Sequence, residues 1–410
     1  MRRWNLRHYA ISSYVTAALL AGCGGSPAPI GAPGAAPQVT ALAARTTSSN
    51  YKVLYSFGAP PDGNTPNGRL INVDGTLYGT TYYGGAHGDG TVFSITPDGT
   101  EKVLYSFGAP PEGDNPHASL IDVDGTFYGT TAGGGADGEG TVFSITPGGT
   151  EKVLYSFGAP PDGHNPQGSL INVDGRLYGT TAGGGVDGDG TVFSVTPGGT
   201  EKVLYSFGKS PDGNYPQAGL LDARGTLYGT TFKGGSSDAC YYSTVYFTCG
   251  TVFSIKRDGT EKVLHSFSNK DGATPVASLI KVKGTLYGTT SYGGSHFCHR
   301  ATCGAVFSIT TDGREKVLHS FSGRGGDNPV VSLVNVNGIL YGTTEYGGRQ
   351  DKGTVFRVTL SGAEKMLHHF RGGTDGVMPE AALINVKGKL YGTTAGGGTH
   401  GGGTVFALKP

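Results

Sequence analysis

The sequence predicts an all-β protein: a seven-bladed β-propeller whose blades are four-stranded antiparallel sheets. Three observations predict this fold: a repeat of about fifty residues, four short strand patterns within each repeat, and chain ends that divide one repeat between them. The first marker of the repeat is Tyr-Gly-Thr-Thr, which begins at Tyr78, Tyr128, Tyr178, Tyr228, Tyr287, Tyr341 and Tyr391. The second marker, Gly-Thr-Val-Phe, begins at Gly90, Gly140, Gly190, Gly250, Gly304, Gly353 and Gly403, with Ala305 once replacing the threonine.

One complete repeat contains four strand patterns, here called a, b, c and d. In the first repeat they are expected at residues 69–73, 76–83, 90–96 and 100–107, which are rich in Val, Ile, Tyr, Phe and Thr. Asp74-Gly75 between a and b is typical of a tight hairpin turn, because both residues accept a positive φ. No segment has the 3.6-residue periodicity of an amphipathic helix.

The strands are apolar on both faces, so each sheet must be covered on both sides. Propeller blades, packed radially against their neighbours, provide that cover. The chain opens with a lone d pattern at 51–57 and ends just after a c pattern at 403–408. We therefore expect the N-terminal strand to complete the last blade and close the ring, which removes the exposed sheet edges of an open array. An open β-solenoid offers no reason for this complementary division.

The wording of the repeat, LYGTT…GG…GTVFSI…G…EKVLYSF, resembles the Gloeo/Verruco (GloVer) tandem repeat of bacterial surface proteins across residues 51–410. The order of its strands, turns and glycine pair also resembles kelch propeller blades. The GloVer resemblance implies a propeller attached to a bacterial surface. It implies no particular chemistry, because no activity is assigned to that repeat.

Residues 1–22 are expected to be an export signal. They carry three arginines and no acid, followed by a short apolar stretch that is too short to span a bilayer. Leu20-Ala21-Gly22-Cys23 looks like a bacterial lipobox, which implies cleavage before Cys23 and a diacylglycerol on its sulfur. An ordinary signal peptide with a stray cysteine is the alternative. Residues 23–50 have the Pro, Ala, Gly and Ser bias of a flexible tether, and residues 51–410 form the propeller.

Charge and composition exclude some classes of partner. The basic and acidic residues number 31 each, and removing the signal leaves a slight acidic excess. A nucleic-acid-binding surface needs a basic face, so no nucleic acid is expected. The expected protein is a monomer of the bacterial cell envelope, attached to the outer membrane or cell surface through lipidated Cys23.

The loops of a propeller fall on two faces. The a–b and c–d turns are tight and share one face, whereas the longer d–a and b–c loops share the other, where binding residues are expected. An acid before glycine recurs in the d–a loops, at Asp62, Glu112, Asp162, Asp212, Asp271 and Asp375. A group present in nearly every repeat is interpreted as loop structure. A ring of Ca²⁺ sites is the alternative, although the spacing is not that of a calcium loop.

Two b–c loops are unlike the others. The fourth contains Cys240 and Cys249, and the fifth contains Cys298 and Cys303. In an exported chain an even set of cysteines predicts disulfides, here 240–249 and 298–303, with cross-pairing between the loops as an alternative. Zinc bound by these cysteines with His296 and His299 is a second alternative, but the Cys-x₂-Cys spacing is missing. No metal and no cofactor are expected.

These two loops also hold the candidate binding residues, which are Tyr241, Tyr242, Tyr246, Phe247, His296, Phe297 and His299. Aromatic side chains on a stapled protrusion suit ligand contact, since tyrosine offers a large area at a low entropic cost. The alternative is a rigid cap without a ligand. His87, His117, His164 and His400 occur singly in other loops and are interpreted as solvated residues.

No motif for catalysis is found. The sequence lacks a G-x-S-x-G elbow, an HExxH helix and a phosphate-binding glycine loop before a helix. The predicted function is therefore a binding or scaffold module that recognises a protein or a glycan through one loop face, and not an enzyme. A propeller lyase or hydrolase acting on a polysaccharide is one alternative, and a purely structural surface protein is another.

Overall fold

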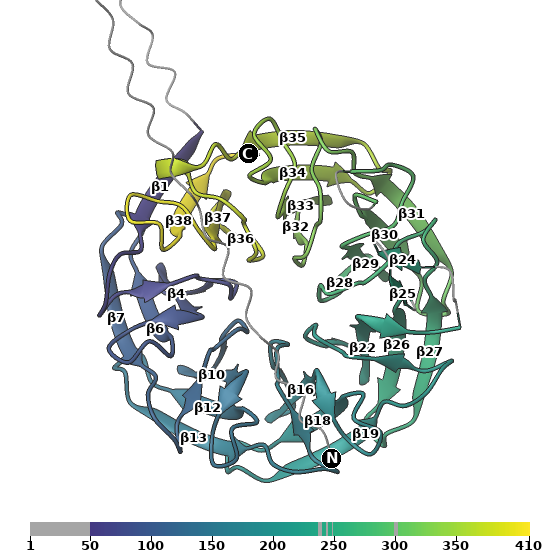
Figure 1. Ribbon diagram of the computed structural model, residues 1–410, viewed down its shortest axis with the longest axis horizontal. Coiled ribbons are helices and arrows are strands. Elements are labelled where there is room, and N and C mark those ends of the chain that lie inside the picture. Colours follow the sequence, from purple (N-terminus) through teal and green to yellow (C-terminus); the bar gives the residue numbers. More distant parts are fainter. Residues whose placement is uncertain (1–49, 237–239, 243–244, 248, 299–301) are drawn as a thin grey trace, which may run out of the picture. The chain divides into compact units, whose positions relative to one another are not determined.

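The computed structural model describes residues 50–410 except 237–239, 243–244, 248 and 299–301. In strands β24 and β25 it describes the backbone but not the side chains. The described residues form seven four-stranded antiparallel sheets arranged around a central channel (Figure 1). The prediction of a seven-bladed propeller is confirmed. No helix of the described part is long and apolar enough to cross a membrane.

The strands run outward from the channel in the order a, b, c, d. From blade 1 to blade 7, strand a is β3 (Ile71–Val73), β9 (Ile121–Val123), β15 (Ile171–Val173), β21 (Leu221–Ala223), β28 (Ile280–Val282), β32 (Val334–Val336) and β36 (Ile384–Val386). Strand b is β4 (Thr76–Thr81), β10 (Thr126–Thr131), β16 (Arg176–Thr181), β22 (Thr226–Thr231), β29 (Thr285–Thr290), β33 (Ile339–Thr344) and β37 (Lys389–Thr394).

The two outer positions follow the same order. Strand c is β6 (Thr91–Ile95), β12 (Thr141–Ile145), β18 (Thr191–Val195), β26 (Thr251–Lys256), β30 (Ala305–Ile309), β34 (Thr354–Thr359) and β38 (Thr404–Leu408). Strand d is β7 (Glu101–Ser106), β13 (Glu151–Ser156), β19 (Glu201–Ser206), β27 (Glu261–Ser266), β31 (Glu315–Ser320), β35 (Glu364–His369) and, in blade 7, β1 (Tyr51–Ser56).

Short strands that the sequence did not predict link some of the loops. In each of the first four d–a loops, a two-residue strand pairs with the glycine pair that follows strand b. These pairs are β2 (Gly63–Asn64) with β5 (Tyr83–Gly84), β8 (Gly113–Asp114) with β11 (Gly133–Gly134), β14 (Gly163–His164) with β17 (Gly183–Gly184), and β20 (Gly213–Asn214) with β23 (Lys233–Gly234). The b–c loop of blade 4 holds β24 (Cys240–Tyr242) and β25 (Val245–Phe247), and the 3₁₀-helix η1 is Gly373–Asp375.

The ring closes as predicted. β1 pairs antiparallel with β38 along its whole length, from Tyr51 opposite Leu408 to Ser56 opposite Thr404. Tyr51 takes the position that glutamate holds in the other d strands, and its ring stacks on His368 with the centroids 3.8 Å apart. Its hydroxyl donates a hydrogen bond of 2.7 Å to the backbone oxygen of Asp375. The seam therefore has aromatic contacts to blade 6 in addition to the β-ladder of blade 7.

The Tyr-Gly-Thr-Thr marker joins neighbouring strands and neighbouring blades. In blade 1 the first threonine, Thr80, donates to the backbone oxygen of Ala118 in the next blade at 3.1 Å. The second, Thr81, shares a hydrogen bond of 2.8 Å with Thr91 of the Gly-Thr-Val-Phe marker. A Cβ on Gly79, which precedes these threonines, would lie 2.7 Å from Phe93, so only glycine fits there. Both markers are thus explained by contacts within and between blades.

The core lies between blades rather than within them. Each interface contains one phenylalanine from the end of strand d and one from strand c of the next blade, as in Phe57 against Phe93 with the centroids 5.1 Å apart. The same edge-on pair recurs at the other six interfaces. These phenylalanines are fully or almost fully buried, and edge-to-face pairs of this kind stabilise beyond their buried area.

The recurrent acid of the d–a loops has a structural role. Asp62 accepts hydrogen bonds from the backbone amides of Gly58 at 2.6 Å and Gly63 at 2.7 Å, and from the Tyr55 hydroxyl at 2.9 Å. The same set of bonds recurs around Asp162 and Asp212. The prediction that this acid is loop structure is supported. In strand d of blades 4 and 6 a histidine takes the place of this tyrosine: His265 lies 3.1 Å from Asp271 and His368 lies 3.3 Å from Asp375.

A second carboxyl group approaches each of these acids except Asp375, which has Tyr51 there instead. This carboxyl group belongs to the glutamate that begins strand d of the following blade, and burial, followed by the neighbouring Asp62, raises the pKa of Glu101 to about 7. Burial also raises the pKa to about 7 at Glu151, Glu201, Glu261 and Glu315, and raises that of Glu364. The outer rim therefore carries five carboxyl groups whose pKa is raised to about 7 in the folded ring.

We predict that deleting residues 51–57 lowers the melting temperature by roughly 10 °C or more, because it removes strand d of the last blade and leaves β38 as an exposed edge. Deleting residues 24–50, a tether by composition, should change it by less than about 2 °C. Differential scanning calorimetry of the two deletions against the full chain makes the comparison. Equal effects would contradict the role of β1 in closure.

We also predict that the ring is more stable at pH 6.5 than at pH 8.5. A glutamate whose pKa is higher folded than unfolded stabilises the fold at low pH, and loses that contribution as the pH rises through about 7. Burial lowers the pKa of His319 and His369, which opposes this trend only as the pH falls through about 6.5. The melting temperature should therefore fall by a few degrees between pH 6.5 and 8.5.

The matched variants for this test change three rim carboxyls together, as Glu101→Gln, Glu151→Gln and Glu201→Gln. This triple variant should flatten the pH dependence of the melting temperature. Replacement of the exposed Asp137 by Asn should leave the dependence unchanged. An unaltered slope in the triple variant would show that these carboxyls do not control it.

Candidate functional site

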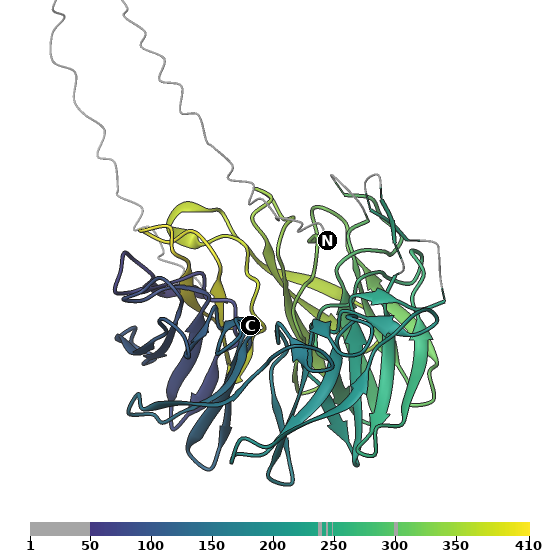
Figure 2. The same ribbon diagram turned by 60° about the horizontal axis from the view of Figure 1, so that its bottom comes forward.

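The two faces of the propeller differ in their exposed apolar side chains. We call the face with the d–a and b–c loops the loop face and the other the turn face (Figures 1 and 2). Among the described residues, every large exposed apolar side chain lies in a d–a or b–c loop segment: Tyr83, Val186, Tyr215, Phe297 and Tyr346. Val186 is 75% exposed and Phe297 is 84% exposed. The loop face therefore offers apolar contact area that the described turn face lacks.

The loop of blade 5 has the predicted staple. Cys298 and Cys303 form a disulfide with their Cα atoms 5.3 Å apart. The disulfide takes both sulfurs out of consideration as zinc ligands, because a metal binds the free thiolate. Phe297 projects beside the staple, and its neighbour His296 is also exposed. Of the predicted binding residues, His299 lies outside the described part.

The loop of blade 4 contains a hairpin that the sequence did not predict. Its strands β24 and β25 pair with Tyr241 opposite Tyr246. The side chains of Cys240, Tyr241, Tyr242, Tyr246 and Phe247 lie outside the described residues. Cys249 is buried and disulfide-bonded, and its predicted partner, Cys240, is one of the residues whose side chain is not described.

One described group of side chains has the composition of a metal site. The ligand atoms of His265, Asp271 and Glu315 lie within 4.8 Å of one another. This group occupies the rim position that Tyr55, Asp62 and Glu101 occupy in another blade, with histidine in place of tyrosine. Its geometry is therefore accounted for by the rim architecture. Cys298, Cys303 and Asp327 also cluster, but both cysteines are oxidised.

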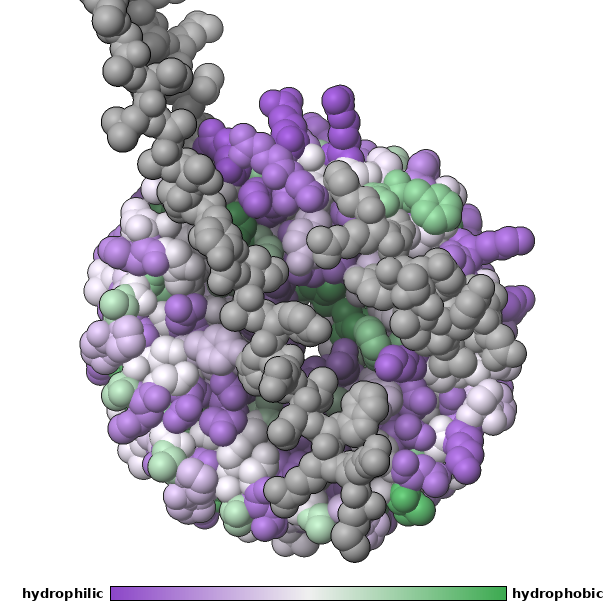
Figure 3. Space-filling model, viewed as in Figure 1, coloured by the Kyte–Doolittle hydropathy of each residue, from purple (hydrophilic) through white to green (hydrophobic). Residues whose placement is uncertain are grey.

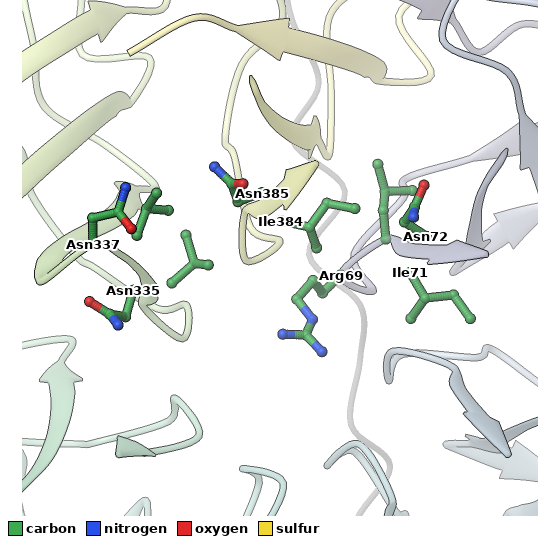
Figure 4. A pocket seen from close by; sticks show the side chains of 10 residues that line it. Arg69, Ile71, Asn72, Asn335, Asn337, Ile384 and Asn385 are labelled. Atoms are coloured by element: carbon green, nitrogen blue, oxygen red, sulfur yellow. The ribbon is translucent and has the colours of Figure 1, made fainter. Parts of the chain in front are cut away.

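The central channel is lined by strand a and the residues that precede it. Side chains alternate along a strand, so residues 67, 69 and 71 of blade 1 and their equivalents face the channel while Leu70 packs into the blade. Near the loop face the channel narrows to a neck of about 90 Å³. Toward the turn face it widens into a larger cavity of about 770 Å³ (Figure 4). Figure 3 shows the hollow at the centre of the loop face, bordered by both hydrophobic and hydrophilic residues.

The neck is formed by seven residues, one from each blade. Each of them directly follows the proline that recurs in the d–a loops. They are Asn67, His117, Gln167, Gln217, Val276, Val330 and Glu380. The next inward-facing layer is Arg69, Ser119, Ser169, Gly219, Ser278, Ser332 and Ala382. A third layer is aliphatic, as at Ile71 and Ile384. Within a layer, several blades carry the same kind of residue, and individual blades depart from it.

Three charged or titratable residues interrupt these layers: Arg69, His117 and Glu380. Burial lowers the pKa of His117, which favours a neutral imidazole, and the edge of its ring lies against Tyr82. Burial and the nearby Glu345 raise the pKa of Glu380 to about 7. The Arg69 side chain is solvent-exposed within the channel. The three residues line the same neck.

Sequence reasoning missed these channel residues. His117 was interpreted as a solvated loop histidine, whereas the structure places it in the wall of the neck. Arg69 and Glu380 were not identified at all. The signal was available in the repeat, because Arg69 stands where the other blades have only Ser, Gly or Ala. Recognising it required knowing that this position faces the channel.

Comparisons with known proteins agree with the repeat pattern. Residues 34–246, 163–297 and 298–410 match the Gloeobacter/Verrucomicrobia repeat. A search of curated protein sequences finds no significant match.

Solved structures with a similar fold include the tricorn protease, at 10% identity and a TM-score of 0.43 over 80% of this chain. This chain spans 27% of the tricorn protease chain. They also include a gluconolactonase from Xanthomonas campestris, at 14% identity and a TM-score of 0.39, covering 66% of this chain and 79% of that one. Likeness at this level carries no argument about this chain. The repeat match spans the propeller from β1 to β38, and the protein belongs to the Gloeobacter/Verrucomicrobia repeat family.

Proposed function

We propose that the protein is an exported binding or scaffold module, anchored by a lipid on Cys23, that contacts a protein or glycan through its loop face. The supporting observation is the confinement of the large exposed apolar side chains to that face in the described part of the chain. Single exposed apolar residues are ordinary on any protein surface. Their restriction to one of two faces is the feature that calls for a ligand.

The construction of the loop face suits recognition. Tyrosine and phenylalanine are enriched in the cores of protein interfaces, and four of the five exposed apolar side chains here are Tyr or Phe. The loops that carry them are held by short strand pairs, by the bonds to Asp62 and its equivalents, and in blade 5 by the 298–303 disulfide. Loops held in this way lose little freedom on binding, which favours affinity.

One observation favours an enzyme as the second candidate. A neutral His117 and a Glu380 whose pKa is about 7 line the same neck, and groups that titrate near neutrality suit acid–base chemistry. Among the described residues, however, neither has a hydrogen bond to a serine, cysteine or second acid that would complete a catalytic arrangement. Binding through the loop face is therefore preferred.

We predict that Phe297→Ala combined with Val186→Ser weakens ligand binding roughly tenfold or more, because exposed apolar side chains of this kind form the energetic centre of interfaces. Ligands are to be found by glycan-array screening and by cross-linking capture from the cell envelope, and affinity is then measured by surface plasmon resonance. The matched turn-face variant, Asp98→Ala with Arg314→Ala, should bind as the unmodified protein does. Loss of binding in the turn-face variant alone would reverse the assignment of the face.

We further predict that Cys23 carries lipid. Cells expressing the full chain should incorporate an alkyne-tagged fatty acid into the protein, and it should sediment with membranes. Cys23→Ser should abolish the label and release the protein from the membrane fraction, because no other lipid attachment point is expected. Unchanged membrane association without label would point to a different anchor.

A further inference from the structure

The channel contains one cation that the repeat does not require. At the position of Arg69 four blades have serine, one has glycine and one has alanine, so the ring folds without a charged residue there. The Arg69 side chain projects into the channel between the aliphatic residues Ile71 and Ile384 (Figure 4). It borders the neck, the larger cavity toward the turn face and a further section of the channel. A structural role shared with the other blades does not explain it.

Among the described residues, no ion pair includes Arg69. Asp122 and Glu380 line the same sections of the channel as Arg69, and neither forms an ion pair with it. The Arg69 side chain is solvent-exposed within the channel, so its guanidinium can contact an anion that enters from solution.

The wall of the wider section offers further hydrogen-bond donors. That section is lined by Arg69 and four asparagines and by no acidic residue. The side-chain oxygens of Asn335 and Asn385 accept bonds from the amides of Gly338 and Gly388, which leaves their NH₂ groups as donors.

The serine layer adds hydroxyl protons. Ser119 Oγ accepts from the backbone amide of Arg69 at 2.9 Å, and Ser169 Oγ accepts from that of Ser119 at 3.1 Å. Each hydroxyl keeps its own proton for a further bond. The polar groups next to the guanidinium are thus mainly donors.

We propose that the channel binds a small hydrophilic oxyanion, a carboxylate or a phosphate, with Arg69 as its principal contact. A guanidinium presents two parallel N–H groups to an oxyanion, and such charge-assisted bonds are among the strongest in proteins. The asparagine amides of the wider section would receive the polar remainder of the ligand. This site goes beyond the proposed loop-face contact and does not depend on it.

The test uses the full chain with Cys23→Ser, which removes the lipid, at low ionic strength so that salt does not screen the site. Isothermal titration calorimetry is run with D-glucuronate, with D-glucose as its neutral counterpart, and with inorganic phosphate. D-Glucose should not bind. Binding of D-glucuronate identifies a carboxylate site, and binding of phosphate without D-glucuronate identifies a phosphate site.

Arg69→Ser is the decisive variant, because it installs the residue that four other blades already have, and it should fold normally. It should weaken anion binding roughly tenfold or more, and Arg69→Lys should fall between the two. Arg176→Ser removes a positive charge outside the channel and should bind as the parent does. The proposal is overturned if neither anion binds the parent, or if Arg69→Ser binds it equally well. Neither result would bear on the Phe297 and Val186 variants, which test the loop face.

Discussion

The structure depends on the contact between neighbouring blades. Each sheet has two apolar faces, and the phenylalanine pair at each interface is buried only when both blades are present. The first threonine of Tyr-Gly-Thr-Thr adds a hydrogen bond across the same interface in six of the seven blades. No blade can satisfy these groups alone, so the stable object is the complete ring. The sequence repeats because every blade must supply the same contacts to its neighbours.

Much of the fold could be predicted because each repeat contains the residues that make the same contacts. The number of blades, the closing role of residues 51–57 and the structural role of the loop acids all follow from what recurs. The exception at Ala305 can also be explained. In blade 1 the hydroxyl of Thr91 partners Thr81, and Ala305 lacks that hydroxyl. Among the described residues, the Oγ1 of the corresponding Thr290 is therefore buried without a hydrogen-bond partner. The predicted strands were one or two residues too long, because pattern alone does not show where pairing stops.

The features that could not be predicted depend on residues of different repeats that lie close together in space. The rim places Glu101 beside Tyr55 and Asp62, three residues that come from two different blades. The channel places Arg69, His117 and Glu380 on one wall although more than three hundred residues separate the first from the last in sequence. Propensity and spacing describe neighbours along the chain, and these sites depend on the closure of the ring. The Cys298–Cys303 staple was predictable because its two residues belong to one loop.

The position of β1 also constrains when the protein can fold. Tyr51 pairs with Leu408 across nearly the whole domain, so the last blade cannot form until the final strand of the chain is available. The entropic cost of closing so long a loop grows only logarithmically with its length, and the buried contacts of two interfaces offset it. Stacking of the earlier blades shortens the gap that closure must span. A chain that crosses a membrane as an extended thread would therefore complete its ring only on the far side, after the C-terminus has arrived.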